Sequence, residues 1–325
     1  MANFSAANAI GITEAANFIP ELWSDEVIAA YKANLVLGQL VSRMNHKGKK
    51  GDTVHIPSPT RGTASAKAHA TQVTLINNVE GVTNVSIDRH FEYSRLIEDM
   101  AEVQGLSSLR KFYVDDAGHA LAKMVDWHLH VLGTGLQGGT LDTSGVDTPG
   151  AEITYTNSTG AVIGSDGSTK WVDTTDGNGA ALADAGIRKM IQTLDDVDVP
   201  MSERYMIIPP VEKKNLMGIS RFTEQAFTGE SGGANGIRNG LVGDVYGMPV
   251  YVSTNCGLCK DAGDTNSFRA GMILHKSAFV LIEQMSVRSQ TQYKQEWLAD
   301  LMTVDTIYGV GELRNDAGIV FIVPA

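Results

Sequence analysis

The longest helical pattern in the chain covers residues 106–132. Its apolar residues recur at steps of three and four, which places one face of an α-helix in a core. That face comprises Leu106, Leu109, Tyr113, Ala117, Leu121, Met124, His128 and Leu132. Charged residues fill the other face together with Asp126 and His130. At 1.5 Å per residue the helix is roughly 40 Å long. Because no second helix of that length follows, we expect it to lie on a layer of strands.

Residues 51–95 predict a long two-stranded ribbon. Residues 51–57 alternate apolar and polar positions, a polar tip with Arg61 and Lys67 follows, and residues 82–96 alternate again. About fourteen residues at 3.3 Å each give strands roughly 45 Å long. A two-stranded ribbon is only marginally stable alone in water. We therefore expect a surface outside the subunit's own core to support it; the alternative is an internal hairpin of an ordinary sheet.

Two other stretches are distinguished by composition. Residues 1–19 are small and nearly uncharged, which predicts an extended arm, and Pro20 opens a short amphipathic helix that carries Trp23. Residues 133–179 are dominated by Gly, Ser, Thr and Asp, which predicts a surface excursion in which single strands can sit at 151–156, 161–164 and 170–173. Neither a GxxxxGK[ST] motif nor a GxGxxG turn between a strand and a helix occurs there, so a nucleotide cradle is disfavoured.

The rest of the chain alternates helices and strands. The predicted elements are a helix at 181–196, a buried strand at 203–210, a short helix at 211–218, a strand-turn-strand at 240–255, an apolar strand at 275–284, one long alternating strand at 290–313, a turn at Asn315–Asp316 and a last buried strand.

Charge and cysteine content exclude several classes of protein. The net charge is −11, whereas affinity for nucleic acids depends largely on a basic stripe. Sequence-specific binding of DNA or RNA is therefore disfavoured. The longest basic cluster, residues 46–50, is interpreted as a solvated loop or a contact to an acidic neighbour. Two cysteines in 325 residues indicate a reducing compartment. No apolar run is long enough for a membrane span, and the start lacks the features of a signal peptide.

Candidate chemistry is sparse. Cys256 and Cys259 have metal or redox spacing, but a structural zinc needs four ligands, and we interpret the pair as incidental loop thiols. His128 and His130 lie about 200° apart on a helix, which predicts one histidine in the apolar stripe and one exposed. Nothing assembles into a catalytic group, so we expect no catalytic residue, cofactor or metal site.

The order of the elements carries a resemblance that no single motif does. The segments are FIPELWSDEVIAAYKANLVLGQLV at 18–41, GKKGDTVHIPSPTRGTASA at 48–66, GLVGDVYGMPVYVSTN at 240–255, HKSAFVLIEQ at 275–284 and IYGVGELRNDAGIVFIV at 307–323. In this order they resemble the arm helix, extended loop, axial-domain core and closing strands of tailed-bacteriophage major capsid proteins. That Hong Kong-type phage shell fold is shared with encapsulins.

The resemblance implies an α+β phage major capsid fold with an N-terminal arm, an extended two-stranded loop, a peripheral domain with a long spine helix, and a mixed α/β axial domain. The implied ranges are 1–45 for the arm and arm helix, 46–100 for the extended loop, 101–135 for the spine helix, 136–180 for the Gly/Ser/Thr-rich excursion, 181–283 for the axial domain, 284–314 for the long peripheral strands and 315–325 for the closing strand.

The function implied is an icosahedral virion shell around double-stranded DNA, assembled in the bacterial cytoplasm and matured by domain rotation. Its partners would be further copies of the chain, a separate scaffolding protein, a portal and a cement protein. An encapsulin-like cargo compartment, or a thiol or metal enzyme using Cys256 and Cys259, are the alternatives.

Five residues are the predicted contacts between subunits. Arg61 and Lys67 would pair with carboxylates and set register, since an exposed ion pair contributes only about 0–1 kcal/mol. Trp23, Phe91 and Tyr93 would contribute most of the contact energy, as aromatic anchors do at interfaces.

Overall fold

The structure is a computed structural model that describes residues 35–47, 50–59, 62–73, 75, 80–99, 109–142, 147–155, 160–174, 176–219, 244–260, 262–263 and 266–325. The predicted arm, the helix that carries Trp23 and the loop residue Arg61 lie outside these residues.

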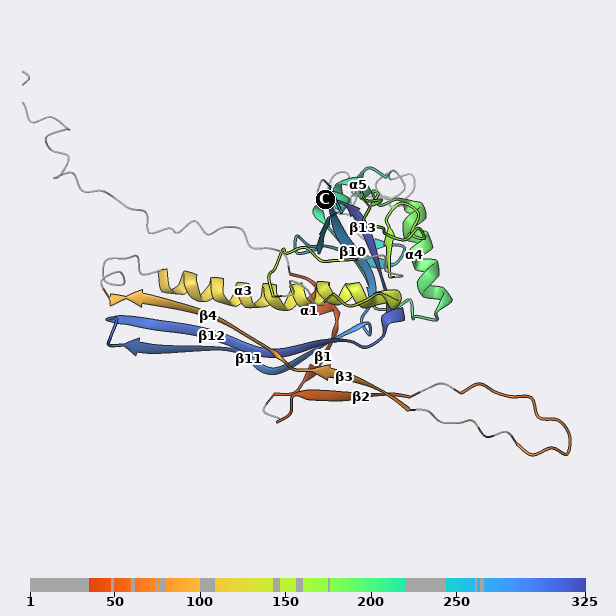
Figure 1. Ribbon diagram of the computed structural model, residues 1–325, viewed down its shortest axis with the longest axis horizontal. Coiled ribbons are helices and arrows are strands. Elements are labelled where there is room, and N and C mark those ends of the chain that lie inside the picture. The colour runs from red at the N-terminus through yellow and green to blue at the C-terminus, as the bar shows by residue number, and fades with distance from the viewer. Residues whose placement is uncertain are drawn as a thin grey trace, which may run out of the picture.

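A long helix lies along a four-stranded sheet, as its apolar stripe predicts (Figure 1). The helix is α3 (Leu109–Leu132), and the strand order is β1 (Ser42–Asn45), β11 (Phe279–Lys294), β12 (Ala299–Glu312) and β4 (Arg89–Glu98). Ala117 and Leu121 of α3 pack on Val304 of β12. The prediction that the helix needs a layer of strands is confirmed.

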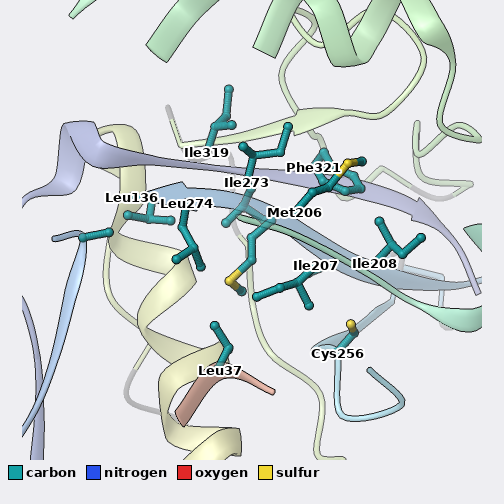
Figure 2. Packing of buried hydrophobic residues seen from close by; sticks show 14 of the residues in the cluster. Leu37, Leu136, Met206, Ile207, Ile208, Cys256, Ile273, Leu274, Ile319 and Phe321 are labelled. Carbon is teal, nitrogen blue, oxygen red and sulfur yellow. The ribbon is translucent and has the colours of Figure 1, made fainter. Parts of the chain in front are cut away.

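The second layer is a mixed seven-stranded sheet, which we call the axial sheet because most of its strands lie in the range 181–283 predicted for the axial domain. Its order is β5 (Ala161–Ile163), β13 (Gly318–Pro324), β10 (Ser267–His275), β6 (Arg204–Ile208), β8 (Met248–Val252) and β7 (Asp244–Val245), with β9 (Leu258–Lys260) paired to β10. Helices α4 (Asp184–Asp196) and α5 (Pro210–Met217) lie beside it (Figure 1). Its side chains form the main core, which extends to Leu37 of the short helix α1 (Leu37–Leu40) and to Leu136 (Figure 2).

Two elements of these sheets differ from the sequence prediction. The strand β10, which lies between β13 and β6, is missing from the predicted elements, which leave residues 256–274 without a strand, although residues 267–275 are mostly buried. The single long strand predicted at 290–313 is a hairpin, in which β11 and β12 meet at a turn over residues 295–298. That turn contains no Gly, Pro, Asn or Asp, so its sequence gives no turn signal, and Leu298 adopts a positive φ of 44°.

The ribbon is shorter than predicted. Strand β2 (Thr53–Pro59) pairs with β3 (Glu80–Ser86), but the chain then bends, and β4 joins the sheet under α3 instead of continuing the ribbon. At the ribbon's base Val85 and Ile87 pack on Val280 and Ile282 of β11. Beyond the paired strands, residues 62–73 run away from the body (Figure 1).

The segment at 133–179 is more buried than its composition predicts. The 3-10 helix η3 (Gly133–Gly138) continues α3, and Leu136 is 0% exposed. Strand β5 lies within the strand predicted at 161–164 and joins the axial sheet, and the side chains of Tyr155 and Trp171 are buried in the main core. The surface-excursion prediction is therefore wrong for these parts of the segment, because small polar residues here separate short buried stretches.

Two glycines of β12 let β3 cross it closely. A Cβ on Gly309 would lie 2.4 Å from the carbonyl oxygen of Ser86, and one on Gly311 would lie 2.6 Å from Val85 Cγ2. Strand β3 of the ribbon therefore crosses β12 at two positions where β12 has no side chain.

We expect Gly309→Ala to lower the free energy of unfolding by about 1–3 kcal/mol, because backbone atoms of β3 must move to admit the methyl group. Thermal unfolding and limited proteolysis of the ribbon would measure the effect. Gly118→Ala is the matched control: nothing lies within 4 Å of its added Cβ, and alanine in a helix interior gains about 1 kcal/mol over glycine. Equal responses of the two variants would contradict the close crossing.

Candidate assembly surfaces

The loop between β2 and β3 is a long extension whose described residues are not covered by the rest of the described chain. Every described residue from 62 to 75 is exposed, including Lys67. Val73 and Leu75 are 61% and 88% exposed, which leaves two apolar side chains in water near the loop's return. The β2–β3 pairing ends at Pro59 and Glu80. The loop therefore presents an extended, partly apolar surface that another molecule can cover.

The turn between β11 and β12 is a second exposed surface, which the sequence prediction missed. Trp297 is 68% exposed and Leu298 is 64% exposed at the end of the hairpin farthest from the axial sheet (Figure 1). Behind them the Tyr293 hydroxyl donates to Asp99 Oδ2 at 2.7 Å, and the Asp99 amide donates to the Leu298 carbonyl at 3.1 Å. An exposed tryptophan on a turn that hydrogen bonds hold in place is typical of a contact surface.

Phe91 and Tyr93 lie on β4 and contact α3 of the same chain. The Phe91 ring centroid is 5.3 Å from that of His128. The Tyr93 hydroxyl donates to Asp116 Oδ2 at 3.1 Å and accepts from Arg95 Nε at 2.6 Å. Both side chains are half-buried between sheet and helix. Their role between subunits stays a prediction, as do the roles of Trp23, Arg61 and Lys67.

The face of the sheet opposite α3 carries a charged cluster. Val304 packs toward α3, so the neighbouring Asp305 points away from it. Asp305 accepts two hydrogen bonds from Arg288, at 2.8 and 3.1 Å, and its Oδ2 lies 3.2 Å from His90 Nε2. The hydrogen bonds from Arg288 lower the pKa of Asp305. The cluster ties β11, β12 and β4 together across the sheet.

Both histidines of the HLH sequence are buried, so the prediction that one is exposed is wrong. His128 and His130 are 0% and 1% exposed, and Asp126, placed on the polar face, is 2% exposed. The reason is that α3 has the sheet on one side and the axial layer on the other near its end, so both faces are covered (Figure 1). His128 Nδ1 lies 2.7 Å from the Tyr308 hydroxyl, and its Nε2 lies 3.3 Å from Asp147 Oδ1.

Burial, assisted by the positive charge of Arg89, lowers the pKa of His128 from 6.5 to about 4. Between these values the unfolded chain binds the proton and the folded chain does not, so stability falls as the pH drops from about 6.5 to about 4. We expect His128→Gln, which cannot be protonated, to flatten that dependence. Urea unfolding across this pH range measures it, and His69→Gln, in the exposed loop, is the control. An unchanged slope in His128→Gln would contradict the assignment.

Cys256 lies in the loop between β8 and β9, as predicted, whereas Cys259 lies in β9, and both side chains belong to the core. Each is 1% exposed, and they form no disulfide. Burial raises the pKa of Cys256 to about 12 and raises that of Cys259 further. A thiol with a raised pKa is a poor nucleophile and a poor metal ligand. Among the described residues no group of three His, Cys, Asp or Glu side chains has the arrangement of a metal site.

The described helices include none that is long and apolar enough to cross a membrane. The sequence comparisons are also without result: no protein-family model matches the chain, and no curated protein matches it.

Solved structures, in contrast, match nearly the whole chain. A chain from Mycobacterium phage Che8 is 23% identical, with a TM-score of 0.69 over 94% of this chain and 97% of that one. The capsid of cyanophage P-SCSP1u gives 18% identity and a TM-score of 0.70 over 98% and 96% of the two chains. The capsid of a native GTA particle gives 12% identity and a TM-score of 0.64 over 98% and 100%. The chain therefore has the fold of tailed-phage capsid proteins, the Hong Kong-type phage shell fold that the order of its sequence segments predicts.

Proposed function

We propose that this chain is the major capsid protein of a tailed phage or a gene-transfer particle, and that its copies close into an icosahedral shell around double-stranded DNA. The observation that carries the proposal is the loop between β2 and β3, whose described residues from 62 to 75 are all exposed. The base of the ribbon packs on β11 of its own chain, but the described loop residues beyond Pro59 and Glu80 are exposed, and a neighbouring copy that covers them would supply the support that the rest of the ribbon has. The capsid fold along almost all of the chain supports the same reading.

The mechanism proposed is mechanical. Contacts that are individually weak become sufficient when a closed symmetry repeats them in every subunit. The loop and the Trp297–Leu298 turn lie on different sides of the body (Figure 1), so one chain can contact more than one neighbour. The net charge of −11 suits a wall that does not attract and hold the phosphates of packaged DNA. The repulsion is confined to short range, since charges separated by more than about 10 Å are screened at ordinary salt.

Maturation is the finer part of the proposal. Packaging would rotate the axial sheet relative to the four-stranded sheet and flatten α3, and the rotation would be a rigid-body change of the kind seen in other switching assemblies. A separate scaffolding protein and a portal would direct assembly in the bacterial cytoplasm, and a cement protein would bind the finished virion shell.

An encapsulin-like compartment is the alternative with the same fold, and its mark would be a cargo enzyme inside the shell without DNA. A thiol or metal enzyme is disfavoured, because Cys256 and Cys259 are each 1% exposed and both thiols have a raised pKa. We accordingly propose a non-enzymatic structural role.

Expression of the full chain with and without the scaffolding protein and portal from the same genome tests the function. Closed shells of uniform size in electron micrographs, filled with DNA after packaging, are expected. A chain that stays monomeric at high concentration with both partners present would overturn the proposal, and shells that contain a co-purified enzyme and no DNA would favour the compartment.

A further inference from the structure

The buried carboxylate of Asp126 joins three segments that are far apart in the sequence. Its Oδ1 accepts the amides of Val36 and Leu37 at 3.1 and 2.8 Å, at the start of α1. Its Oδ2 accepts Asn255 Nδ2 at 3.0 Å, from the loop between β8 and β9. One side chain on α3 thus holds the segment that precedes β1 and a loop of the axial sheet.

His130 lies one helical turn farther along α3 and makes no hydrogen bond to Asp126 in this arrangement. It is 1% exposed, and neither of its ring nitrogens has a hydrogen-bond partner among the described residues. Its Nε2 lies 3.7 Å from Asp126 Oδ2, the oxygen that Asn255 occupies. Buried polar groups without a partner are uncommon in native proteins and call for an explanation.

We propose that Asp126 is the pivot of a two-position hydrogen-bond switch, in which His130 replaces Asn255 on Oδ2 when the axial-sheet loop moves away from α3. In this structure Asn255 donates to Asp126 Oδ2, and His130 makes no hydrogen bond to that oxygen.

The geometry identifies Oδ2 as the exchangeable atom. Oδ1 already accepts two backbone amides, so α1 stays attached in both positions. Side chains four apart on a helix are neighbours, and a small change of side-chain torsion brings His130 Nε2 within hydrogen-bond distance. Burial lowers the pKa of His130, which favours the neutral ring, and Nε2 donates in the tautomer that carries its proton there.

Asn255 is suited to leave. Its only other described side-chain bond to α3 is a long one, from Nδ2 to the Lys123 carbonyl at 3.4 Å. The backbone amide of Asn255 donates to Ser253 Oγ of the same loop at 3.1 Å, so Asn255 moves with that loop. A buried carboxyl that lost a donor without replacement would oppose such a movement, and His130 removes that opposition. The loop movement itself rests on the proposed function, in which the axial sheet rotates relative to α3.

A double-mutant cycle on the unassembled full-length chain tests the exchange without requiring a shell. His130→Phe should change the unfolding equilibrium constant less than about twofold when Asn255 is present, because no hydrogen bond is lost. In the Asn255→Ala background, where His130 occupies Oδ2, the same change should raise the unfolding constant about tenfold or more, as loss of a hydrogen bond to a charged group does. His130→Gln, which can still donate, should restore most of that loss.

Equal effects of His130→Phe in both backgrounds would overturn the switch and leave His130 a packing residue. If a phenylalanine variant does not fold, ring ¹⁵N shifts of His130 decide: they should change between the wild-type chain and Asn255→Ala, toward an Nε2 that donates. Unchanged shifts would overturn the proposal. Neither readout depends on assembly, so a failure here is distinguishable from a failure to form shells.

Discussion

Replacing residues 60–79 with Asn-Gly is expected to abolish shell formation and to leave the protomer folded. Pro59 and Glu80 are already paired across the ribbon, and a two-residue turn of this type joins such strands directly. The described loop residues from 62 to 75 are exposed, so their removal takes no side chain from the core. Thermal unfolding and electron microscopy with scaffolding protein present would measure the two effects separately.

A loop of unchanged length built from Gly and Ser is the matched control. If the side chains of the loop make the contact, both variants fail to assemble; if only its reach matters, the Gly/Ser loop retains assembly. Closed shells from the Asn-Gly variant would contradict the role assigned to the loop. An unfolded protomer would show instead that the loop belongs to the subunit's own fold.

Asp126→Ala is expected to have the largest effect on the protomer itself. The change leaves the amides of Val36 and Leu37 and the amide group of Asn255 without their acceptor. Each buried donor left unpaired costs about 1–3 kcal/mol, so the free energy of unfolding should fall by about 3 kcal/mol or more. Urea denaturation of the unassembled chain measures this loss, and hydrogen exchange should show faster exchange in α1.

Asp196→Ala provides the comparison, since that carboxylate is exposed at the end of α4 and its removal should change stability by no more than about 0.5 kcal/mol. A loss of similar size in both variants would mean that net charge, and not the three hydrogen bonds, determines the result.

Strong periodicity predicts the parts of this fold that have one buried face. The apolar stripe from Leu109 to Leu132 correctly gives α3 and its need for a sheet, and the alternating positions of β2 correctly give a strand. The prediction fails for β10, which is covered on both faces and reads as a run of apolar residues without alternation. It fails again at 295–298, because the turn is made by residues that favour no turn. The domain boundaries remain predictions.

The candidate surfaces are predicted less well than the fold, and the reason is that contacts depend on tertiary position. The alternating pattern places Phe91 and Tyr93 on the predicted ribbon, but the bend after Ser86 turns them onto α3. Asp126 and His130 read as polar surface because nothing local shows that the axial layer covers that side of the helix. Trp297 could have been found as a tryptophan among polar residues, although only the hairpin shows that it is exposed.

The parallel pairing of β1 with β11 has a consequence for synthesis of the chain. The Ser42 hydroxyl donates to the Lys276 carbonyl, a partner 234 residues away. Strand β4 likewise pairs with β12, whose residues come much later in the chain. Neither strand has its partner until the ribosome has made most of the polypeptide, and contacts between such distant residues form slowly. Nascent subunits should therefore carry unpaired strand edges for much of translation, and such edges favour aggregation until the partner strands are made.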